Sequence, residues 1–388
     1  MNSVDAAGRG GSIAPVTMSE RERETRRLAA DLAPLARDAQ ARAALDDGGG
    51  LGAASDILAA ETGLAFVADD ASPADLTLCF RVLERLAEPD LEERLAALRA
   101  RSPKAIIVVS CVLDEALTPD GANAHRTVRP CAWWRALVER HFGQAFASPL
   151  DLEEACVVTT WTPSAEALAA FNRRIAAARW RKRATRRWRR LVNAARLMRR
   201  PALNEADLRA LLDGKSVAIV GNALSLAQRD YGAEIDAHDL VVRFNAARIP
   251  QARSHGWRTD WIATGIPLSQ DAAVLRGAAQ ILWMAPNRKN IPTWMPAWPG
   301  GFYLHAREAH DALGEEIGAP RPSTGAMLVD LVMRAPGLRR ASMFGFDFFT
   351  TLSVSPGHTA ASAPHDFAKE KVFMRALAER DARLTIRT

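Results

Sequence analysis

Two short apolar runs that both lead to asparagine constrain this chain more than any other feature. Residues 217–220 run straight into Gly221-Asn222, and residues 240–242 lead into Arg243-Phe244-Asn245. Short apolar runs bounded by Gly and Asn are typical of buried parallel strands. In an open α/β sheet, ligands bind at the carboxyl ends of such strands, and an asparagine there can donate and accept hydrogen bonds without adding charge. A ligand site is one interpretation; two core strands with asparagine in their turns is the other.

Three patterns follow one another between residues 215 and 375. They are VGN at 220–222 with YGAEIDAHDLVVRFN at 231–245, then PSTG at 322–325 with MFGF at 343–346, and last His365 with Glu370. In this order they resemble the large, small and very small sialylmotifs of glycosyltransferase family 29, the sialyltransferases. The resemblance implies a single Rossmann-like variant fold, a CMP-sugar donor and a glycan or lipid-linked glycan acceptor.

The resemblance also implies where the donor binds. Ser323 precedes an apolar run, so residues 323–325 should form a helix N-terminus, whose free N–H groups bind phosphate or carboxylate; an ordinary N-cap is the other interpretation, and the two are compatible. His358 is a candidate by proximity, because the segment 347–350 lacks the His or Tyr of the family pattern. The expected nucleotide-sugar site comprises Gly221, Asn222, Asn245, Ser323, Thr324, Gly325 and His358.

His365 and Glu370 are the expected catalytic pair. A histidine in the first turn of a helix feels the positive end of the dipole, which favours neutral imidazole, the form that accepts a proton from a hydroxyl. Glu370 would orient the helix or hold substrate. Residues 201–388 contain no Asp-x-Asp, so we expect no metal, with neutral donors and a helix end stabilising the CMP leaving group.

The N-terminal part carries a second resemblance. Asp46, Gly48, Gly50 and Gly52 fit D-x-G-x-G-x-G, and DLTLCFRVLE follows at 75–84. Together they resemble class I S-adenosylmethionine-dependent methyltransferases over about 45–158. That family places the two patterns about two β-α units apart, whereas here they are only some two dozen residues apart. We therefore expect a shortened domain with at least one strand and helix missing, without robust binding of S-adenosylmethionine, and with a scaffold or docking role.

Between the two resemblances lies a strongly basic segment. Residues 172–200 contain thirteen Lys or Arg and no Asp or Glu. At helical spacing Trp180, Trp188, Leu191 and Met198 share one side, a pattern typical of an interfacial membrane helix. A solvated linker is the alternative. Nucleic-acid binding is not expected, because no aromatic platform or groove-reading motif accompanies the charge.

Length and composition allow two domains in 388 residues. We expect an α/β protein with two Rossmann-like domains: a disordered 1–18, a shortened methyltransferase-like domain over 19–165, a basic helical linker over 166–203 and a catalytic domain over 204–388. Strands are expected at 217–220, 239–244, 260–264, 280–284, 302–304 and 341–346, and helices at 323–335 and 364–380.

The compartment is expected to be a reducing, bacterial-type cytoplasm. No run of eighteen apolar residues is present, and the N-terminus has no secretory apolar core. The spacing of the four cysteines suggests neither zinc nor disulfides. Two functions from different classes remain: a CMP-sugar glycosyltransferase of surface polysaccharide synthesis, and a methyltransferase or methyltransferase-like protein whose C-terminal half only binds sugar nucleotides.

Overall fold

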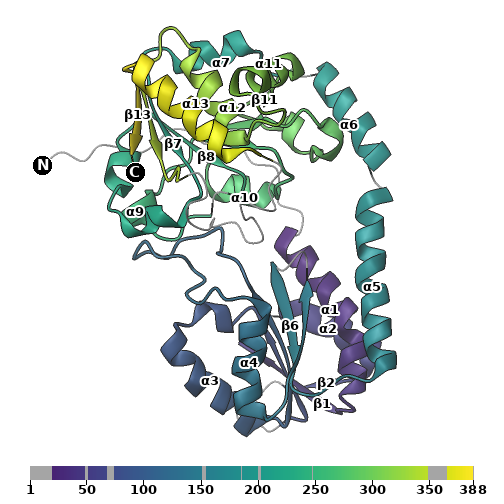
Figure 1. Cartoon of the computed structure of the whole chain (residues 1–388). Helices are drawn as coiled ribbons and strands as arrows, with labels where there is room; N and C mark the ends of the chain where they lie inside the picture. Colours follow the sequence, from purple (N-terminus) through teal and green to yellow (C-terminus); the bar gives the residue numbers. More distant parts are fainter. Residues whose placement is uncertain are drawn as a thin grey trace, which may run out of the picture.

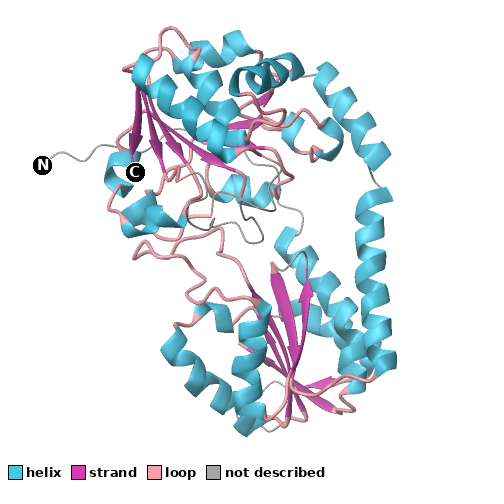
Figure 2. Ribbon diagram, in the orientation of Figure 1, coloured by secondary structure: helices cyan, strands magenta, loops and turns pink. Residues whose placement is uncertain are grey.

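Two α/β units connected by long helices make up the molecule (Figures 1 and 2). The computed structural model describes residues 20–48, 51–67, 74–150, 154–184, 186–199, 202–246, 248–347 and 365–387. Each unit has a mainly or wholly parallel sheet with helices packed against it, so the expected class of two Rossmann-like domains is confirmed. Within the described part of the chain, no helix has both the length and the apolar character needed to cross a bilayer.

The first unit has a mixed sheet. Across it, in the described residues, lie β2 (Ala65–Phe66), β1 (Ala43–Asp47), β3 (Leu76–Phe80), β4 (Lys104–Ser110), β6 (Ala155–Thr159) and β5 (Phe146–Leu150). Strands β1 to β4 are parallel, whereas β6 runs antiparallel to β4 and β5. The helices are α1 (Glu20–Asp38), α2 (Ser55–Thr62), α3 (Glu88–Arg101) and α4 (Cys131–Phe142).

One expectation for this unit needs correction. Cys131 and Cys156 form a disulfide, although their spacing does not suggest one. Adjacent packing explains it: α4 lies against β6, and this brings the two Cα atoms to 5.4 Å, within the range for a disulfide.

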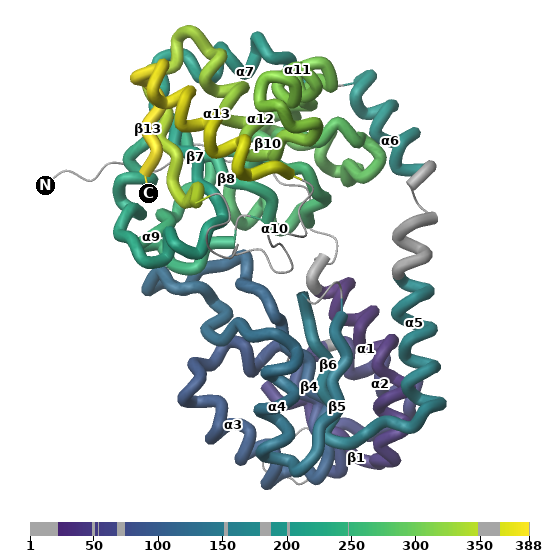
Figure 3. Tube along the Cα trace, viewed as in Figure 1, coloured from purple at the N-terminus to yellow at the C-terminus, as the bar shows by residue number. Residues whose placement is uncertain are grey.

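Helices α5 (Ala165–Ala184) and α6 (Arg186–Arg199) lead from the first unit to the second along one side of the molecule (Figure 3). The N-terminal part of α5 packs against α1, with Phe171 fully buried there. Helix α6 packs on the short 3-10 turns 288–290 and 295–297 of the second unit. In its described residues the basic segment is therefore helical, and its two helices are attached to different units.

The second unit has a parallel sheet. In the described residues its order is β11 (Phe302–Leu304), β10 (Gln280–Trp283), β9 (Trp261–Thr264), β8 (Leu240–Phe244), β7 (Ser216–Val220), β12 (Arg340–Phe344) and β13 (Leu384–Arg387). The helices are α7 (Glu205–Leu212), α8 (Gly232–Asp236), α9 (Ala252–His255), α10 (Gln270–Leu275), α11 (Arg307–Ile317), α12 (Thr324–Met333) and α13 (Phe367–Arg380). All six predicted strands are present to within two residues at each end; β13 is not predicted.

This strand order fixes where a ligand can bind. The chain starts in the middle with β7, moves outward through β8 to β11, and returns to the other side of β7 with β12. The strand order therefore reverses between β7 and β12. In open α/β sheets the crevice outside the carboxyl ends of the strands at such a reversal is the usual ligand site. The pattern of polar residues after β7 and β8 predicts the same edge.

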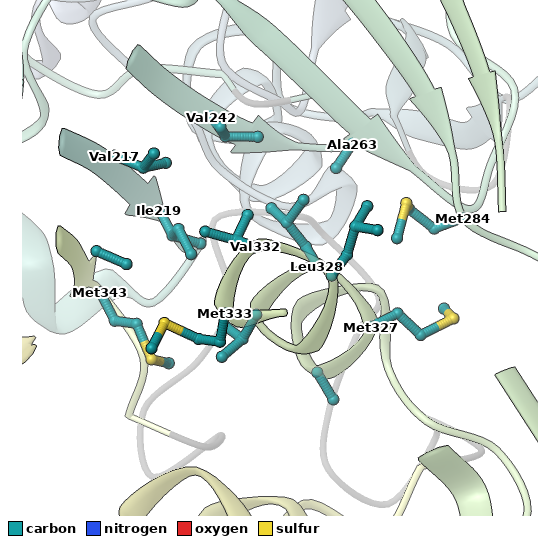
Figure 4. Close-up of a cluster of buried hydrophobic side chains, with 14 of the residues drawn as sticks. Val217, Ile219, Val242, Ala263, Met284, Met327, Leu328, Val332, Met333 and Met343 are labelled. Carbon is teal, nitrogen blue, oxygen red and sulfur yellow. The ribbon is translucent and has the colours of Figure 1, made fainter. Parts of the chain in front are cut away.

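Helix α12 is anchored firmly beneath that edge (Figure 4). Every residue from Ala326 to Met333 is buried, and the helix packs against Val217 and Ile219 of β7, Val242 of β8 and Met343 of β12. Burying one large apolar side chain contributes about 1.5–3 kcal/mol. A set of this size holds α12 in one place, and its N-terminus is held with it.

The two units meet through segments that follow the carboxyl ends of their strands. Ala122 pairs with Gln251 in an isolated β-bridge, and the buried Asn123 donates from Nδ2 to the carbonyl of Ile249 at 2.9 Å. Glu115 accepts hydrogen bonds from Arg248, at 3.2 Å, and from Arg276. The segment after β4 is thus bonded to the segment after β8, so the first unit supports the loop that leaves Asn245.

Candidate active site at the carboxyl edge of the second sheet

Two glycines bring the backbone close together at the point where the strand order reverses. Gly221 follows β7 and Gly345 follows β12; the Gly221 amide donates to the carbonyl of Phe344 at 2.7 Å. A Cβ on Gly221 would lie 2.4 Å from the carbonyl oxygen of Gly345, closer than any side chain tolerates. Gly345 has a φ of +67°, in the left-handed region that favours glycine. This position therefore requires glycine on both sides.

The N-terminus of α12 lies beside these glycines. Phe346, next to Gly345, approaches to 3.0 Å of where a Cβ on Gly325 would be. Ser323 is the N-cap, and its hydroxyl accepts from the amide of Ala326 at 3.1 Å. The amides of Thr324 and Gly325 open the helix and have no preceding turn to donate to. They can donate to an anion at this edge.

Glu370 fixes this helix start from the other side. Its carboxylate accepts from the amide of Ser323 at 2.7 Å and from the hydroxyl of Ser323 at 2.6 Å. The Glu370 side chain is only 1% exposed, and burial raises the pKa of its carboxyl, while the hydrogen bonds from Ser323 oppose that rise. Ser323 is thus occupied by its cap and by Glu370, which leaves Thr324 and Gly325 as the available donors. Glu370 therefore holds the start of α12 through Ser323.

Asn245 joins the third strand end to the same place. It has a φ of +53°, a conformation that asparagine tolerates better than most residues. Its Oδ1 accepts from the hydroxyl of Thr264 at 3.2 Å and from the amide of Gly265 at 3.3 Å. A Cβ on Gly265 would lie 3.1 Å from the Thr324 hydroxyl. The Nδ2 group of Asn245 makes no hydrogen bond within the described residues, so it can donate to a ligand.

His365 is held in one tautomer by a backbone carbonyl. Its Nδ1 lies 2.9 Å from the carbonyl oxygen of Arg321. A carbonyl only accepts, so Nδ1 carries the hydrogen, and neutral imidazole then has its lone pair on Nε2. Helix α13 begins at Phe367 with Asp366 as its N-cap, not at 364 as predicted. His365 therefore precedes the helix instead of lying in its first turn, and the contact with the Arg321 carbonyl orients the ring.

The comparisons with known proteins point to the same part of the chain. Residues 178–267 match the family model described as glycosyltransferase family 29 (sialyltransferase). The chain carries a sialyltransferase-like glycosyltransferase domain. The match includes strands β7, β8 and β9 and the large motif; residues 323–325 and 365–370 lie beyond it.

Solved structures of two kinds resemble this chain. A mammalian sialyltransferase in complex with Gal-beta-1-3GalNAc-ortho-nitrophenol is 17% identical, with a TM-score of 0.36, over 50% of this chain and 78% of that one. The sialyltransferase CstII from Campylobacter jejuni, with CMP-3FNeuAc, is 15% identical, with a TM-score of 0.27, over 44% and 78%. An O-methyltransferase family protein from Burkholderia thailandensis is 13% identical, with a TM-score of 0.29, over 37% and 57%.

The sialyltransferase-like domain brings most of its predicted site residues together. Gly221, Asn245, Thr324 and Gly325 are linked by the contacts above, and Glu370 and His365 join them through Ser323 and Arg321. Asn222, half-buried, follows Gly221 at the same strand end. His358 lies outside the described residues. Arg243, within the large motif, is buried and donates to the carbonyls of His255 and Arg258; burial lowers its pKa to about 10, and its role is to hold that loop.

The glycine-rich pattern of the first unit gives a different result. Asp46 accepts from the amides of Leu51 and Gly52, each at 3.2 Å, so its carboxylate is used within its own loop. Gly48 has a φ of +75°, and a Cβ there would lie 2.9 Å from Cγ2 of Val82. Gly50 is outside the described residues. Among the described residues from Gly52 to β3, the elements are a short 3-10 turn (Gly52–Ala54), α2 and the two-residue β2.

Two features were not predicted from the sequence. Thr264 ends β9 and Gly265 follows it, much as Gly221 follows β7, and the pattern of a polar residue and glycine at the end of an apolar run could have identified this strand end. The second is a pocket of about 370 Å³ between the units, lined by Glu88, Leu113, Ala122, Asn123, His125, Arg126, Val128, Arg129, Pro250 and Gln251. No local pattern predicts it, because its walls come from both units.

Proposed function

We propose that this protein transfers a CMP-activated 2-keto sugar acid, sialic acid or Kdo, to a hydroxyl of a glycan acceptor, with inversion and without a metal. One observation carries the proposal: segments from all three motif regions are joined by direct contacts at the edge where the strand order reverses. Gly221 meets Gly345, Gly325 meets Phe346, and Ser323 meets Glu370. The three motifs are far apart in the sequence, and the fold brings them together at this edge.

The donor fits the groups at this edge. The phosphate of CMP can accept from the amides of Thr324 and Gly325 at the positive end of α12. The amides of Asn222 and Asn245 can donate to the nucleotide without adding negative charge. Residues 201–388 lack Asp-x-Asp, so neutral donors and the helix end are proposed to stabilise the leaving monophosphate in place of a cation.

The reaction follows from the tautomer of His365. Nε2 removes the proton of the acceptor hydroxyl as that oxygen attacks the anomeric carbon from the face opposite CMP. The bond from the anomeric carbon to the phosphate oxygen breaks, and its electron pair leaves with CMP. The carbonyl of Arg321 holds Nδ1–H throughout, so the imidazole keeps its orientation while it gains a proton. Inversion results because the nucleophile and the leaving group are on opposite faces.

A donor screen tests this function. The purified full chain is incubated with CMP-sialic acid, CMP-Kdo or a UDP-sugar, with and without EDTA, and CMP release and the anomer formed are followed by NMR. We expect release of CMP from one of the CMP donors, undiminished by EDTA, and an inverted anomer. Turnover of the UDP-sugar alone, or strict dependence on Mg²⁺ or Mn²⁺, would contradict the proposal.

The acceptor and the location belong to the same proposal. A bacterial surface polysaccharide on a lipid carrier is built at the cytoplasmic face of a membrane. The basic segment 172–200, with thirteen Lys or Arg and no acidic residue, would attract the protein to anionic lipids there. We therefore propose a cytoplasmic location, peripheral on the inner face of the membrane, with a lipid-linked glycan as acceptor; the Cys131–Cys156 disulfide would be an exception to the rarity of disulfides in that compartment.

A further inference from the structure

Helix α6 turns its largest apolar side chains toward solvent. Trp188, Leu191 and Met198 are 68%, 67% and 80% exposed. At 3.6 residues per turn, positions i, i+3 and i+10 fall on one side of a helix, so the three side chains form one stripe, called here the α6 stripe. A surface helix of a globular protein normally packs such a stripe against the core. This helix does the reverse.

The opposite side of α6 attaches it to the second unit. Asn193 is buried and donates from Nδ2 to the carbonyl of Ile291 at 3.0 Å, and Arg196 donates to the carbonyl of Thr293. Leu197 packs against the cluster that contains Met295. These contacts fix the rotation of the helix about its own axis. The outward direction of the α6 stripe is therefore a consequence of packing on the other side.

The location of α6 makes the stripe accessible to a flat surface. The helix lies at the outer margin of the second unit, away from the sheet (Figures 1 and 3). The part of the chain that the structure describes places no other element over the exposed Trp188, Leu191 and Met198. A partner that covers the stripe can approach from outside without displacing any part of the fold.

The charge around the stripe identifies the partner. Arginines flank it on both sides, among them Arg190 and Arg199, and the whole of 172–200 has no Asp or Glu. A second copy would bring two such basic segments together, which like charges oppose. A nucleic acid would attract the guanidinium groups but would leave Leu191 and Met198 exposed to water. An anionic bilayer provides both parts, headgroups for the arginines and acyl chains for the stripe.

We propose that α6 is an interfacial membrane helix that inserts Trp188, Leu191 and Met198 into the headgroup–acyl boundary of an anionic bilayer. The proposal rests on the proposed function for the choice of membrane, and it adds the docking residues and the orientation. The helix would lie in the plane of the interface, so the second unit would rest beside the membrane with Asn193 and Arg196 on its protein side.

Flotation of the full chain with vesicles tests this surface. The vesicles contain phosphatidylcholine alone or phosphatidylcholine mixed with phosphatidylglycerol. We expect the protein to float with the anionic vesicles only. The variant W188S/L191S/M198S should bind them at least about tenfold more weakly, since even one large apolar side chain left in water accounts for on the order of that factor. The matched control is L275S/V372S, which changes two side chains that are 65% and 70% exposed elsewhere; it should bind like the wild type.

Each outcome decides the proposal independently of the reaction. Transfer to a short soluble acceptor should be the same in both variants, so a loss of flotation with intact transfer isolates the surface from the active site. Equal flotation of the stripe variant and the wild type would overturn the proposal. So would a lipid-free dimer in sedimentation that the stripe variant abolishes, or salt-sensitive retention of duplex DNA with no binding to either vesicle.

Discussion

The two sheets of this protein reverse their strand order in the same way, and yet the reversal points differ completely. In the first sheet the reversal lies between β1 and β3, and in the second between β7 and β12. The side chain of Val82 occupies the space above Gly48 in the first sheet. At the second reversal the atoms nearest to a Cβ on Gly221 belong to the backbone of Gly345, with the side chain of Phe346 at 3.2 Å.

The polar groups show the same contrast. At the first reversal Asp46 is bonded to the amides of its own loop, and the buried Asp47 is paired with Arg94, at 2.6 Å, and with Arg101. At the second, the amides of Thr324 and Gly325 and the Nδ2 group of Asn245 have no intramolecular acceptor within the described residues. A Rossmann-like topology therefore does not by itself make a binding site. The difference lies in whether the polar groups at the strand ends are used by the fold or left for a ligand.

The first unit makes direct contacts with the second beyond the ends of its strands. Its segment 111–130 forms the bridge from Ala122 to Gln251 and the hydrogen bond from Asn123 to Ile249. The guanidinium of Arg276 is almost fully buried against Glu115, and this burial lowers its pKa to about 10. Pairing such a buried cation with a carboxylate from the other unit makes the contact specific, because either partner alone would be costly to bury.

The largest effect that we predict is at the second reversal, between β7 and β12. His365→Ala should lower turnover by about 10²- to 10⁴-fold, the usual contribution of a general base, while the affinity for CMP stays nearly unchanged. Steady-state transfer and CMP titration by calorimetry measure the two quantities. Added imidazole should restore part of the rate, because it supplies the missing base. Full activity in this variant would remove His365 from the reaction.

A second substitution tests whether donor binding requires the close backbone contact between Gly221 and Gly345. Gly221→Ala places a Cβ 2.4 Å from the Gly345 carbonyl, so the strands must shift; such overpacking costs about 1–3 kcal/mol, and donor binding should be lost. The matched control is Gly265→Ala, whose Cβ would meet the movable Thr324 hydroxyl at 3.1 Å. Chemical denaturation and CMP titration should rank the two, with Gly221→Ala the more severe. Equal effects would contradict the argument.

A smaller effect is expected for the amide that follows Gly221. Asn222→Ala should weaken donor binding by about tenfold, because a hydrogen bond contributes about 0.5–1.5 kcal/mol, and should change turnover at saturating donor little. Donor KM and kcat separate these two quantities. Asn172→Ala, on the exposed side of α5, is the control and should match the wild type. A fall in kcat with unchanged KM would place Asn222 in the chemistry.

Sequence alone gave the class of fold and most of the second edge, for a physical reason. Apolar runs that end in glycine and asparagine report burial and strand ends directly, so β7, β8 and Asn245 were predictable. The partner of Glu370 was not, because Glu370 bonds to Ser323 across 47 positions, and no local pattern encodes that pairing. The Cys131–Cys156 disulfide and the pocket between the units could not be predicted for the same reason, because both depend on which elements pack together.

The smallest effect on ligand binding and transfer should come from the first reversal, between β1 and β3. S-adenosylmethionine should not bind, because Asp46 is already used by the amides of Leu51 and Gly52 and Val82 lies above Gly48. Thermal unfolding measures this: CMP at 100 times its Kd should stabilise the protein by roughly 2.7 kcal/mol, whereas S-adenosylmethionine should leave the midpoint unchanged. Asp46→Ala should lower stability by about 1–3 kcal/mol, the sum of two lost hydrogen bonds, without changing transfer. Micromolar binding of S-adenosylmethionine that Asp46→Ala abolishes would show that the first reversal also binds a ligand. The contrast drawn above between the polar groups of the two sheets would then be wrong.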